Sequence, residues 1–344
     1  MMRLPQFRYR APRTIDDAVA WLAESPSDTM LLAGGTDVLP NMKRRQQTPG
    51  TLIGLRNVRE LAGINDGDGL TIGAGVTLSS LLAHRQVRES YAGLWQAAAQ
   101  IATPHLRNMG TIGGNLCLDT RCTYYDQTYE WRKAIDFCMK KDGQTCWVAT
   151  SSPKCLAVSS TDAAPMLQAL GASVTLVSLE GKRVLPVAEL FANDGIYYLT
   201  RRPDELLASI ALPAADGWRS AYWKLRRRGS FDFPVAAAAV ATRLDGPTII
   251  DVRIVLGAVA SRPVESDRAA ALLKGQRLSD ELITEAAAVA AEVAKPMDNT
   301  DFELVWRKAM VRTLVSCALQ DVRGDDMRHR RRQLARQELL ASVT

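Results

Sequence analysis

The sequence predicts an α+β protein in which two α/β subdomains precede a C-terminal three-stranded sheet with helices. Two patterns lead to this prediction. Helical and extended segments alternate up to about residue 218, and three strand patterns followed by three helical ones come after it. The chain has 344 residues, 47% hydrophobic and 23% charged, which is ordinary for a globular protein of several domains. It is therefore long enough to bury a large core.

Residues 1–57 are predicted to form the first subdomain. Its helix covers residues 14–24, where Thr14 is a good capping residue and apolar residues recur at helical spacing. Two short apolar runs, residues 30–33 and 51–55, are typical of buried strands. This order of elements predicts a small βαβ unit.

Residues 58–218 are predicted to form the second subdomain, which an insert at about residues 119–159 interrupts. The expected strands are residues 70–73, 173–179, 183–187 and 206–212, and the expected helices are residues 77–84, 91–101 and 162–170. The insert breaks this alternation and contains four of the six cysteines of the chain. It is therefore expected to have a role of its own.

Residues 219–323 are predicted to form the C-terminal domain. Its expected strands are residues 221–227, 235–243 and 249–256, and its expected helices are residues 264–273, 280–294 and 302–322. Residues 324–344 form a basic tail that contains the run Arg328-His329-Arg330-Arg331-Arg332. The sequence does not predict a structure for this tail.

The net charge of +6, with a pI near 9.0, is partly concentrated in that tail and otherwise dispersed. A solvated tail explains this charge better than a nucleic-acid site does, so we expect no nucleic-acid partner. No stretch approaches the about 18 apolar residues that span a bilayer, and the N-terminus lacks the apolar core of an export signal. We therefore expect a cytoplasmic protein without membrane contact.

Two glycine-containing segments are candidates for a phosphate-binding backbone. They are Gly34-Gly35-Thr36-Asp37, directly after an apolar strand, and Thr111-Ile112-Gly113-Gly114-Asn115. Glycine lets successive backbone N–H groups approach one anion closely, although a single Gly-Gly pair is more often a simple tight turn. Two such loops together favour a dinucleotide held from opposite sides.

Other nucleotide and metal motifs are missing from the sequence. Gly73-Ala74-Gly75 lacks the third glycine of a Rossmann fingerprint, and no phosphate loop of the G-x-x-x-x-G-K-[ST] kind is present. The histidines His84, His105 and His329 are too scattered for a histidine metal site. These absences argue against nucleotide hydrolysis and zinc hydrolase chemistry.

Four cysteines lie within 34 residues of the insert, with the spacing C-x15-C-x7-C-x8-C: Cys122, Cys138, Cys146 and Cys155. This clustering indicates a metal centre. The spacing lacks the C-x2-C pairs of common zinc modules, but it leaves both a 4Fe-4S cluster and structural zinc open. Disulfides fit poorly without an export signal, and buried free thiols are a further alternative. Cys117 and Cys317 are expected to pack in the interior.

Three segments resemble the FAD-binding subunits of the xanthine dehydrogenase family of molybdenum enzymes: Leu32-Ala33-Gly34-Gly35-Thr36-Asp37, Arg107-Asn108-Met109-Gly110-Thr111-Ile112-Gly113-Gly114-Asn115 and Ser160-Thr161-Asp162-Ala163-Ala164-Pro165. The resemblance covers nearly the whole chain. It implies the FAD-binding fold of the vanillyl-alcohol oxidase type, in two α/β subdomains, followed by a three-stranded C-terminal domain. His105 departs from the family, which often has glutamine there.

The resemblance also implies how FAD is bound. Its diphosphate and ribityl chain would lie against Leu31, Leu32, Ala33, Gly34, Gly35, Thr36, Asp37, Val38, Thr111, Ile112, Gly113, Gly114 and Asn115. Asp162 would contact the sugar part of FAD, and Lys224 would lie near the flavin. The alternatives are that Asp162 is an ordinary helix cap and that Lys224 is a surface strand lysine.

Within that family, the insert is similar to the flavin subunits of the 4-hydroxybenzoyl-CoA reductase branch, through Arg121-Cys122-Thr123-Tyr124-Tyr125 and the four cysteine spacings. This similarity implies that Cys122, Cys138, Cys146 and Cys155 bind one 4Fe-4S cluster. A ferredoxin-like donor would then supply electrons to the cluster and FAD. These would pass through 2Fe-2S clusters on a small partner to a molybdenum cofactor on a large partner, which reduces 4-hydroxybenzoyl-CoA to benzoyl-CoA.

No catalytic residue is expected on this chain, because the substrate site would belong to the large partner. Two alternatives remain at this point. One is the flavin subunit of an aldehyde or purine oxidoreductase of the same family. The other is a scaffold subunit that carries a zinc-clipped docking loop.

Overall fold

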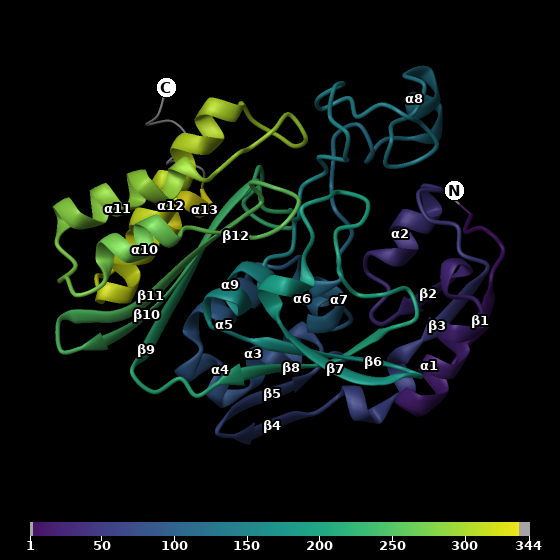
Figure 1. Cartoon of the computed structure of the whole chain (residues 1–344), viewed down its shortest axis with the longest axis horizontal. Coiled ribbons are helices and arrows are strands. Elements are labelled where there is room, and N and C mark those ends of the chain that lie inside the picture. The colour runs from purple at the N-terminus through teal and green to yellow at the C-terminus, as the bar shows by residue number, and fades with distance from the viewer. Residues whose placement is uncertain (1–2, 337–344) are drawn as a thin grey trace.

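The computed structural model describes residues 3–336, and its strands form three sheets, which lie from right to left across the molecule in Figure 1. The first sheet is parallel and consists, in spatial order, of β1 (Arg8–Arg10), β3 (Thr51–Gly54) and β2 (Thr29–Leu32). Helix α1 (Ile15–Glu24) packs on it through Ala18, Val19 and Leu22. Thr14 caps this helix as predicted, because its Oγ1 accepts the N–H of Asp17 at 3.1 Å.

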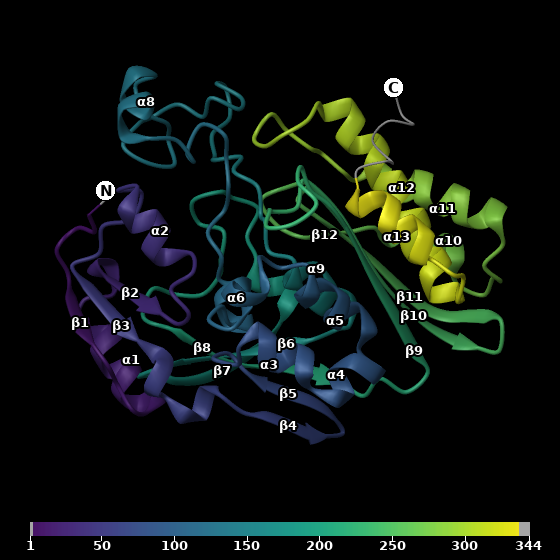
Figure 2. The ribbon, with the colours of Figure 1, turned by 180° about the vertical axis from the view of Figure 1, so that it is seen from behind.

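The second sheet is antiparallel. In spatial order it consists of β4 (Ile64–Gly67), β5 (Gly69–Gly73), β8 (Leu206–Pro213), β6 (Ser173–Ser178) and β7 (Gly181–Pro186). Its helices are α3 (Leu78–Ala83), α4 (Arg85–Ser90), α5 (Ala92–Ala99) and α9 (Ala163–Ala169). These helices share one buried apolar cluster with the sheet. Figure 2 shows α5 and α9 between the second sheet and the strands of the third.

The third sheet has four strands rather than the predicted three. In spatial order it consists of β12 (Val264–Glu265), β11 (Thr248–Gly257), β10 (Ala236–Asp245) and β9 (Trp218–Leu225). Val264 and Glu265 pair with β11, so the helix expected from residue 264 begins only at Asp267. Helices α10 (Asp267–Leu273), α11 (Asp280–Glu292) and α12 (Leu304–Arg323) bury their apolar residues against this sheet. The predicted α+β fold is otherwise confirmed.

The remaining helices are short. They are α2 (Val38–Lys43), α6 (Pro104–Arg107), α7 (Ile112–Leu116), α8 (Tyr129–Ala134) and α13 (Arg328–Ala335), with 3-10 turns at Pro26–Asp28, Leu55–Asn57, Arg59–Leu61 and Val187–Leu190. The basic run of the tail thus lies on α13, and residues 337–344 of the tail lie outside the described residues. Within residues 3–336, no helix combines the length and apolar character that crossing a membrane needs.

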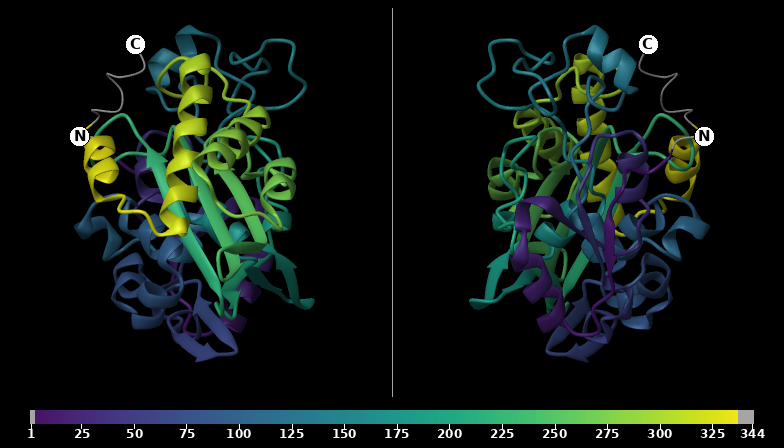
Figure 3. Two further views of the ribbon diagram at one scale, coloured as in Figure 1. Left: turned by 90° about the vertical axis from the view of Figure 1, so that its left-hand side faces the viewer. Right: turned by 90° about the vertical axis from the view of Figure 1, so that its right-hand side faces the viewer.

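The cysteine insert leaves the body of the protein through a narrow neck. The N–H of Arg121 donates to the carbonyl of Val158 at 2.8 Å, and the N–H of Val158 donates back at 2.7 Å. The chain between them projects from the body, with α8 at its outer end, on the same side as the beginning of α12 (Figure 3). The side-chain amide of Asn299, before α12, donates to the Leu156 carbonyl at 2.6 Å and holds the insert there.

Candidate functional site

A cavity of 690 Å³ lies where the three sheets and the insert come together. This volume falls within the about 300–1,000 Å³ that is typical of small-molecule sites. Twelve of the fifteen predicted FAD-contacting residues line it: Leu31, Ala33, Gly34, Gly35, Thr36, Asp37, Val38, Thr111, Gly113, Gly114, Asn115 and Asp162. Leu32, Ile112 and Lys224 do not line it. We call it the central cavity.

The two glycine segments touch each other at the wall of the central cavity. A Cβ atom on Gly34 would lie 1.9 Å from the carbonyl oxygen of Met109, which directly precedes Gly110. Gly35 has a φ of 72°, in the left-handed region that favours glycine. A Cβ atom on Gly113 would lie 2.6 Å from the Cβ of Ala74. Bare backbone is therefore required for these segments to pack closely and face the cavity.

The second glycine segment is a short helix, not the loop that the sequence suggested. Thr111 caps α7, because its Oγ1 accepts the N–H of Gly114 at 3.0 Å. The side-chain oxygen of Asn115 accepts the Thr161 hydroxyl at 2.8 Å and the N–H of Ala163 at 3.1 Å. Asn115 therefore ties α7 to the beginning of α9, where Asp162 lies.

Asp162 and Lys224 form a buried ion pair. The Lys224 ammonium lies 2.9 Å from Oδ2 of Asp162, and the Tyr222 hydroxyl donates to Oδ1 at 2.7 Å. Burial raises the pKa of Asp162 and lowers that of Lys224, and each partner opposes the other's shift. Asp162 begins α9 without capping it through its side chain, and Lys224 is buried rather than on the surface. Lys224 contacts two residues that line the cavity, Asp162 and Asp232, whose carbonyl accepts its ammonium at 2.9 Å.

Arg121 connects the central cavity to the insert. Its guanidinium pairs with Asp37, donates to Oδ1 of Asn41 at 3.3 Å and lies 3.6 Å from Oδ1 of Asp126. Burial raises the pKa of Asp37, and the charge of Arg121 opposes that rise. The next residue along the chain is Cys122, so a single peptide unit separates the cavity wall from the first cysteine.

The four cysteines of the insert are all buried free thiols, exposed by 4–6%. Cys122, Cys138 and Cys155 share one apolar cluster with Tyr125. Burial raises the pKa of Cys122 to about 12 and that of Cys155 to about 11, and the other three insert thiols add to the shift of Cys122. Three of the four thiols thus share one interior, which we call the cysteine interior, and Cys146 lies near enough to add to the pKa shift of Cys122.

The predicted metal centre is not formed in this arrangement. Among residues 3–336, no group of three or more histidine, cysteine or acidic side chains is placed so that it would hold a metal ion. The sulfurs nevertheless receive hydrogen bonds that suit thiolates. The N–H of Ala157 lies 3.5 Å from Sγ of Cys155, and the N–H of Tyr124 donates to the sulfur of Cys122.

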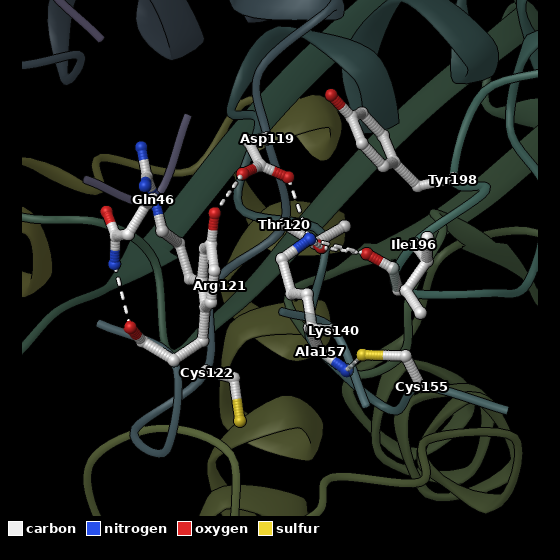
Figure 4. Close-up of polar contacts among 12 residues, drawn as sticks. Gln46, Asp119, Thr120, Arg121, Cys122, Lys140, Cys155, Ala157, Ile196 and Tyr198 are labelled. Carbon is white, nitrogen blue, oxygen red and sulfur yellow. Dashed lines mark hydrogen bonds and ion pairs between the residues drawn. The ribbon is translucent and has the colours of Figure 1, made fainter. Parts of the chain in front are cut away.

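Lys140 is a contact of the site that the sequence did not single out. Its ammonium, in the insert, lies 2.8 Å from both Asp119 Oδ1 and Thr120 Oγ1, and 2.6 Å from the Gly195 carbonyl (Figure 4). Gly195 itself lies close to the insert, because a Cβ on it would lie 2.6 Å from Sγ of Cys155. Lys140 therefore fixes the insert against the body. Other cavity residues that the sequence did not indicate are Arg44, Tyr198, Arg201, Arg228 and Phe233.

Comparison with known proteins identifies the family. A family model described as the FAD binding domain in molybdopterin dehydrogenase matches residues 5–215, and one described as the CO dehydrogenase flavoprotein C-terminal domain matches residues 220–322. The carbon monoxide dehydrogenase medium chain of Afipia carboxidovorans is 29% identical, over 91% of this chain and 96% of that protein. The aldehyde oxidoreductase FAD-binding subunit of Escherichia coli is 32% identical, over 90% of this chain and 96% of that protein.

Solved structures agree with these matches. Carbon monoxide dehydrogenase from Hydrogenophaga pseudoflava superimposes with a TM-score of 0.76 at 29% identity, over 93% of this chain and 98% of that chain. The two family matches together span all three sheets. The chain belongs to the family of FAD-binding subunits of the molybdopterin dehydrogenases.

Proposed function

We propose that this chain is the FAD and 4Fe-4S electron-transfer subunit of a molybdenum-containing 4-hydroxybenzoyl-CoA reductase. The observation that carries the proposal is the placement of four buried thiols in one insert whose neck meets the central cavity at Arg121, the residue before Cys122. A redox centre in the insert would thus lie beside the flavin. The substrate site would belong to a partner subunit, so this chain supplies no catalytic residue.

In this proposal FAD occupies the central cavity. The bare backbone at Gly34, Gly35 and Gly114 fits a diphosphate and ribityl chain, because no side chain projects from it into the cavity. Asp162 accepts hydrogen bonds from the sugar part of FAD, and Lys224 balances its charge. When bound, FAD exchanges one or two electrons.

The four cysteines are the proposed ligands of the 4Fe-4S cluster. Four buried thiols in a single loop segment are a donor set that such a cluster requires, and irregular loops supply it without C-x2-C pairs. The N–H groups of Ala157 and Tyr124 stabilise thiolates at Cys155 and Cys122. The cluster would carry single electrons. Lys140 and Arg121 hold the insert at a fixed place beside the cavity.

The proposed partners are a large subunit with the molybdenum cofactor, a small subunit with 2Fe-2S clusters and a ferredoxin-like electron donor. The name medium chain, which the carbon monoxide dehydrogenase relative carries, supports a multi-subunit assembly. We place the assembly in the cytoplasm. Low-potential electrons would enter through this chain and leave for the large subunit.

A second candidate is the flavin subunit of an aldehyde or purine oxidoreductase. The 32% identity to the aldehyde oxidoreductase subunit favours it. In that case electrons would flow outward from the molybdenum subunit to the flavin. The two candidates differ in which substrate exchanges electrons with the flavin, and so they are separable by experiment.

The test begins with the iron, sulfide, zinc and FAD content of the chain purified without oxygen. Four irons and four sulfides per FAD are expected. One zinc without sulfide would overturn the cluster and leave a zinc-clipped scaffold. The co-purified complex is then used in two assays. In the first, the complex is reduced and then mixed with 4-hydroxybenzoyl-CoA. In the second, the complex is mixed with an aldehyde without prior reduction. Reoxidation of the flavin by the thioester supports the reductase, whereas reduction by the aldehyde alone supports the second candidate.

A further inference from the structure

Arg132 is a fully buried cation without adequate partners. It lies in α8, its exposed fraction is 0%, and none of its three side-chain nitrogens has a hydrogen-bond partner within residues 3–336. Its ion pair is loose, with Nη1 lying 3.6 Å from Oδ2 of Asp142, a carboxylate that is itself 40% exposed. Native structures rarely leave a buried charge so poorly satisfied, because desolvation without compensation is costly.

The guanidinium lies beside the segment of the insert that leads to Cys138. Its carbon lies 5.8 Å from the ring centre of Phe137, the residue before Cys138, and the Arg132 carbonyl accepts the Phe137 N–H at 2.7 Å. Tyr125, whose hydroxyl is within reach of the charge of Arg132, packs in one cluster with Cys122, Cys138 and Cys155. Burial raises the pKa of the Tyr125 hydroxyl and the charges of Arg121 and Arg132 oppose this, so Arg132 acts electrostatically on that ring.

An anion in the cysteine interior would satisfy this cation. A 4Fe-4S core held by four thiolates is an anion, and its reduction by one electron adds a further negative charge. Nearby positive charge and burial are among the factors that set cluster potentials. In a low-dielectric interior, a cation acts on such a charge far more strongly than it does in water.

We infer that Arg132 is the buried counter-charge of the anionic cluster held by the four cysteines, and that it raises the reduction potential of this cluster. The inference rests on the proposed function, because it requires the cluster. It makes Arg132 a positioning and tuning residue rather than a ligand. A purely structural arginine would instead donate hydrogen bonds to acceptors in the surrounding insert, and Arg132 donates none within the described chain.

The test uses the full chain purified without oxygen, as wild type, Arg132→Met, Arg132→Lys and Lys133→Met. Lys133 is the matched control, because it is the next residue of α8, loses the same charge and is exposed. The midpoint potential of the cluster is measured by dithionite titration, followed by electron paramagnetic resonance. We expect a more negative midpoint in Arg132→Met at full iron content, and values close to wild type in the other two variants.

An unchanged midpoint in Arg132→Met at full iron content would overturn the inference alone. Wild-type protein without iron would overturn the proposed function and the inference with it. If Arg132→Met holds less iron than wild type, the melting temperatures of the two iron-free proteins decide between the inference and a structural role for Arg132. A variant at least as stable as iron-free wild type supports the inference, because an unsatisfied charge has been removed. A less stable variant shows a structural role and refutes it.

Discussion

The ammonium of Lys140 lies 2.8 Å from the carboxylate of Asp119, and this buried ion pair joins the insert to the chain outside its neck. The Lys140 side chain is 6% exposed and that of Asp119 is 7% exposed. The same ammonium binds the carbonyl of Gly195, whose N–H donates to the Cys155 carbonyl at 2.9 Å. One lysine therefore holds two ends of the insert against the body of the protein.

Replacing Lys140 by methionine is expected to destabilise the fold by about 3–5 kcal/mol, because it leaves the Asp119 carboxylate buried without its partner. The control is Lys141→Met, since Lys141 is 33% exposed and lies 3.5 Å from the exposed Asp142. That control should cost less than about 1 kcal/mol. Urea unfolding measures both. Equal losses in the two variants would contradict a special role for Lys140.

Gly34→Ala is expected to open the contact between the two glycine segments. The added Cβ would lie 1.9 Å from the Met109 carbonyl oxygen, so the backbone must shift. We expect a loss of about 1–3 kcal/mol and weaker FAD binding. Gly67→Ala is the control, because its Cβ would meet no atom within 4 Å. FAD titration and thermal unfolding check this, and full FAD affinity in Gly34→Ala would refute it.

Asp162 and Lys224 are expected to behave as one unit. Either Asp162→Asn or Lys224→Met should destabilise the protein by about 3–5 kcal/mol, because each leaves an unpaired buried group. The double variant should lose less than the sum, by about 0.5–3 kcal/mol. Urea unfolding of the FAD-free protein gives this coupling energy. Additive losses would mean that the 2.9 Å contact contributes no interaction.

The thiol of Cys122 makes the metal-free protein sensitive to alkali. Burial raises its pKa from 9.0 to about 12. The protonated Cys122 thiol contributes fully to stability below the pKa that it has in the unfolded chain. This contribution is lost as the pH rises through the pKa that it has in the folded protein. Wild type should therefore lose stability relative to Cys122→Ala between pH 9 and pH 12, by at most about 4 kcal/mol. Unfolding free energies of both metal-free proteins at pH 8 and pH 10 check this. A difference that stays constant would contradict it.

The sequence was sufficient for much of the fold and of the cavity. Strand alternation and helix periodicity are local patterns, and they located the long strands of the third sheet to within a few residues. The glycine segments could be recognised in the sequence because Gly34 and Gly113 lie where the Cβ atom of any other residue would clash. Local patterns could not show that the two segments line one cavity, because the segments lie far apart in the chain. The family resemblance supplied that prediction.

Other features depend on tertiary contacts that leave no local signal. The two-residue strand β12 forms because Val264 and Glu265 pair with the edge of β11, and this pairing leaves no pattern in the local sequence. Val264 was therefore assigned to the helix that follows it. The segment after Thr111 was expected as a bare-backbone loop, yet the threonine cap and close packing form α7. The burial of Lys140 and Arg132 depends on how the insert folds, and cysteine spacing contains no information about that.

The neck at Arg121 and Val158 indicates how a flavoprotein with this insert can evolve. Its two backbone hydrogen bonds bring the ends of the insert together as neighbouring residues of a bridge. A short turn would close the same gap, and the glycine segments and Asp162 would keep their places. The thiol-bearing segment is therefore a module that evolution could add to a flavoprotein in one insertion, with the host fold preserved. The same property makes it suitable for transplantation into a related subunit.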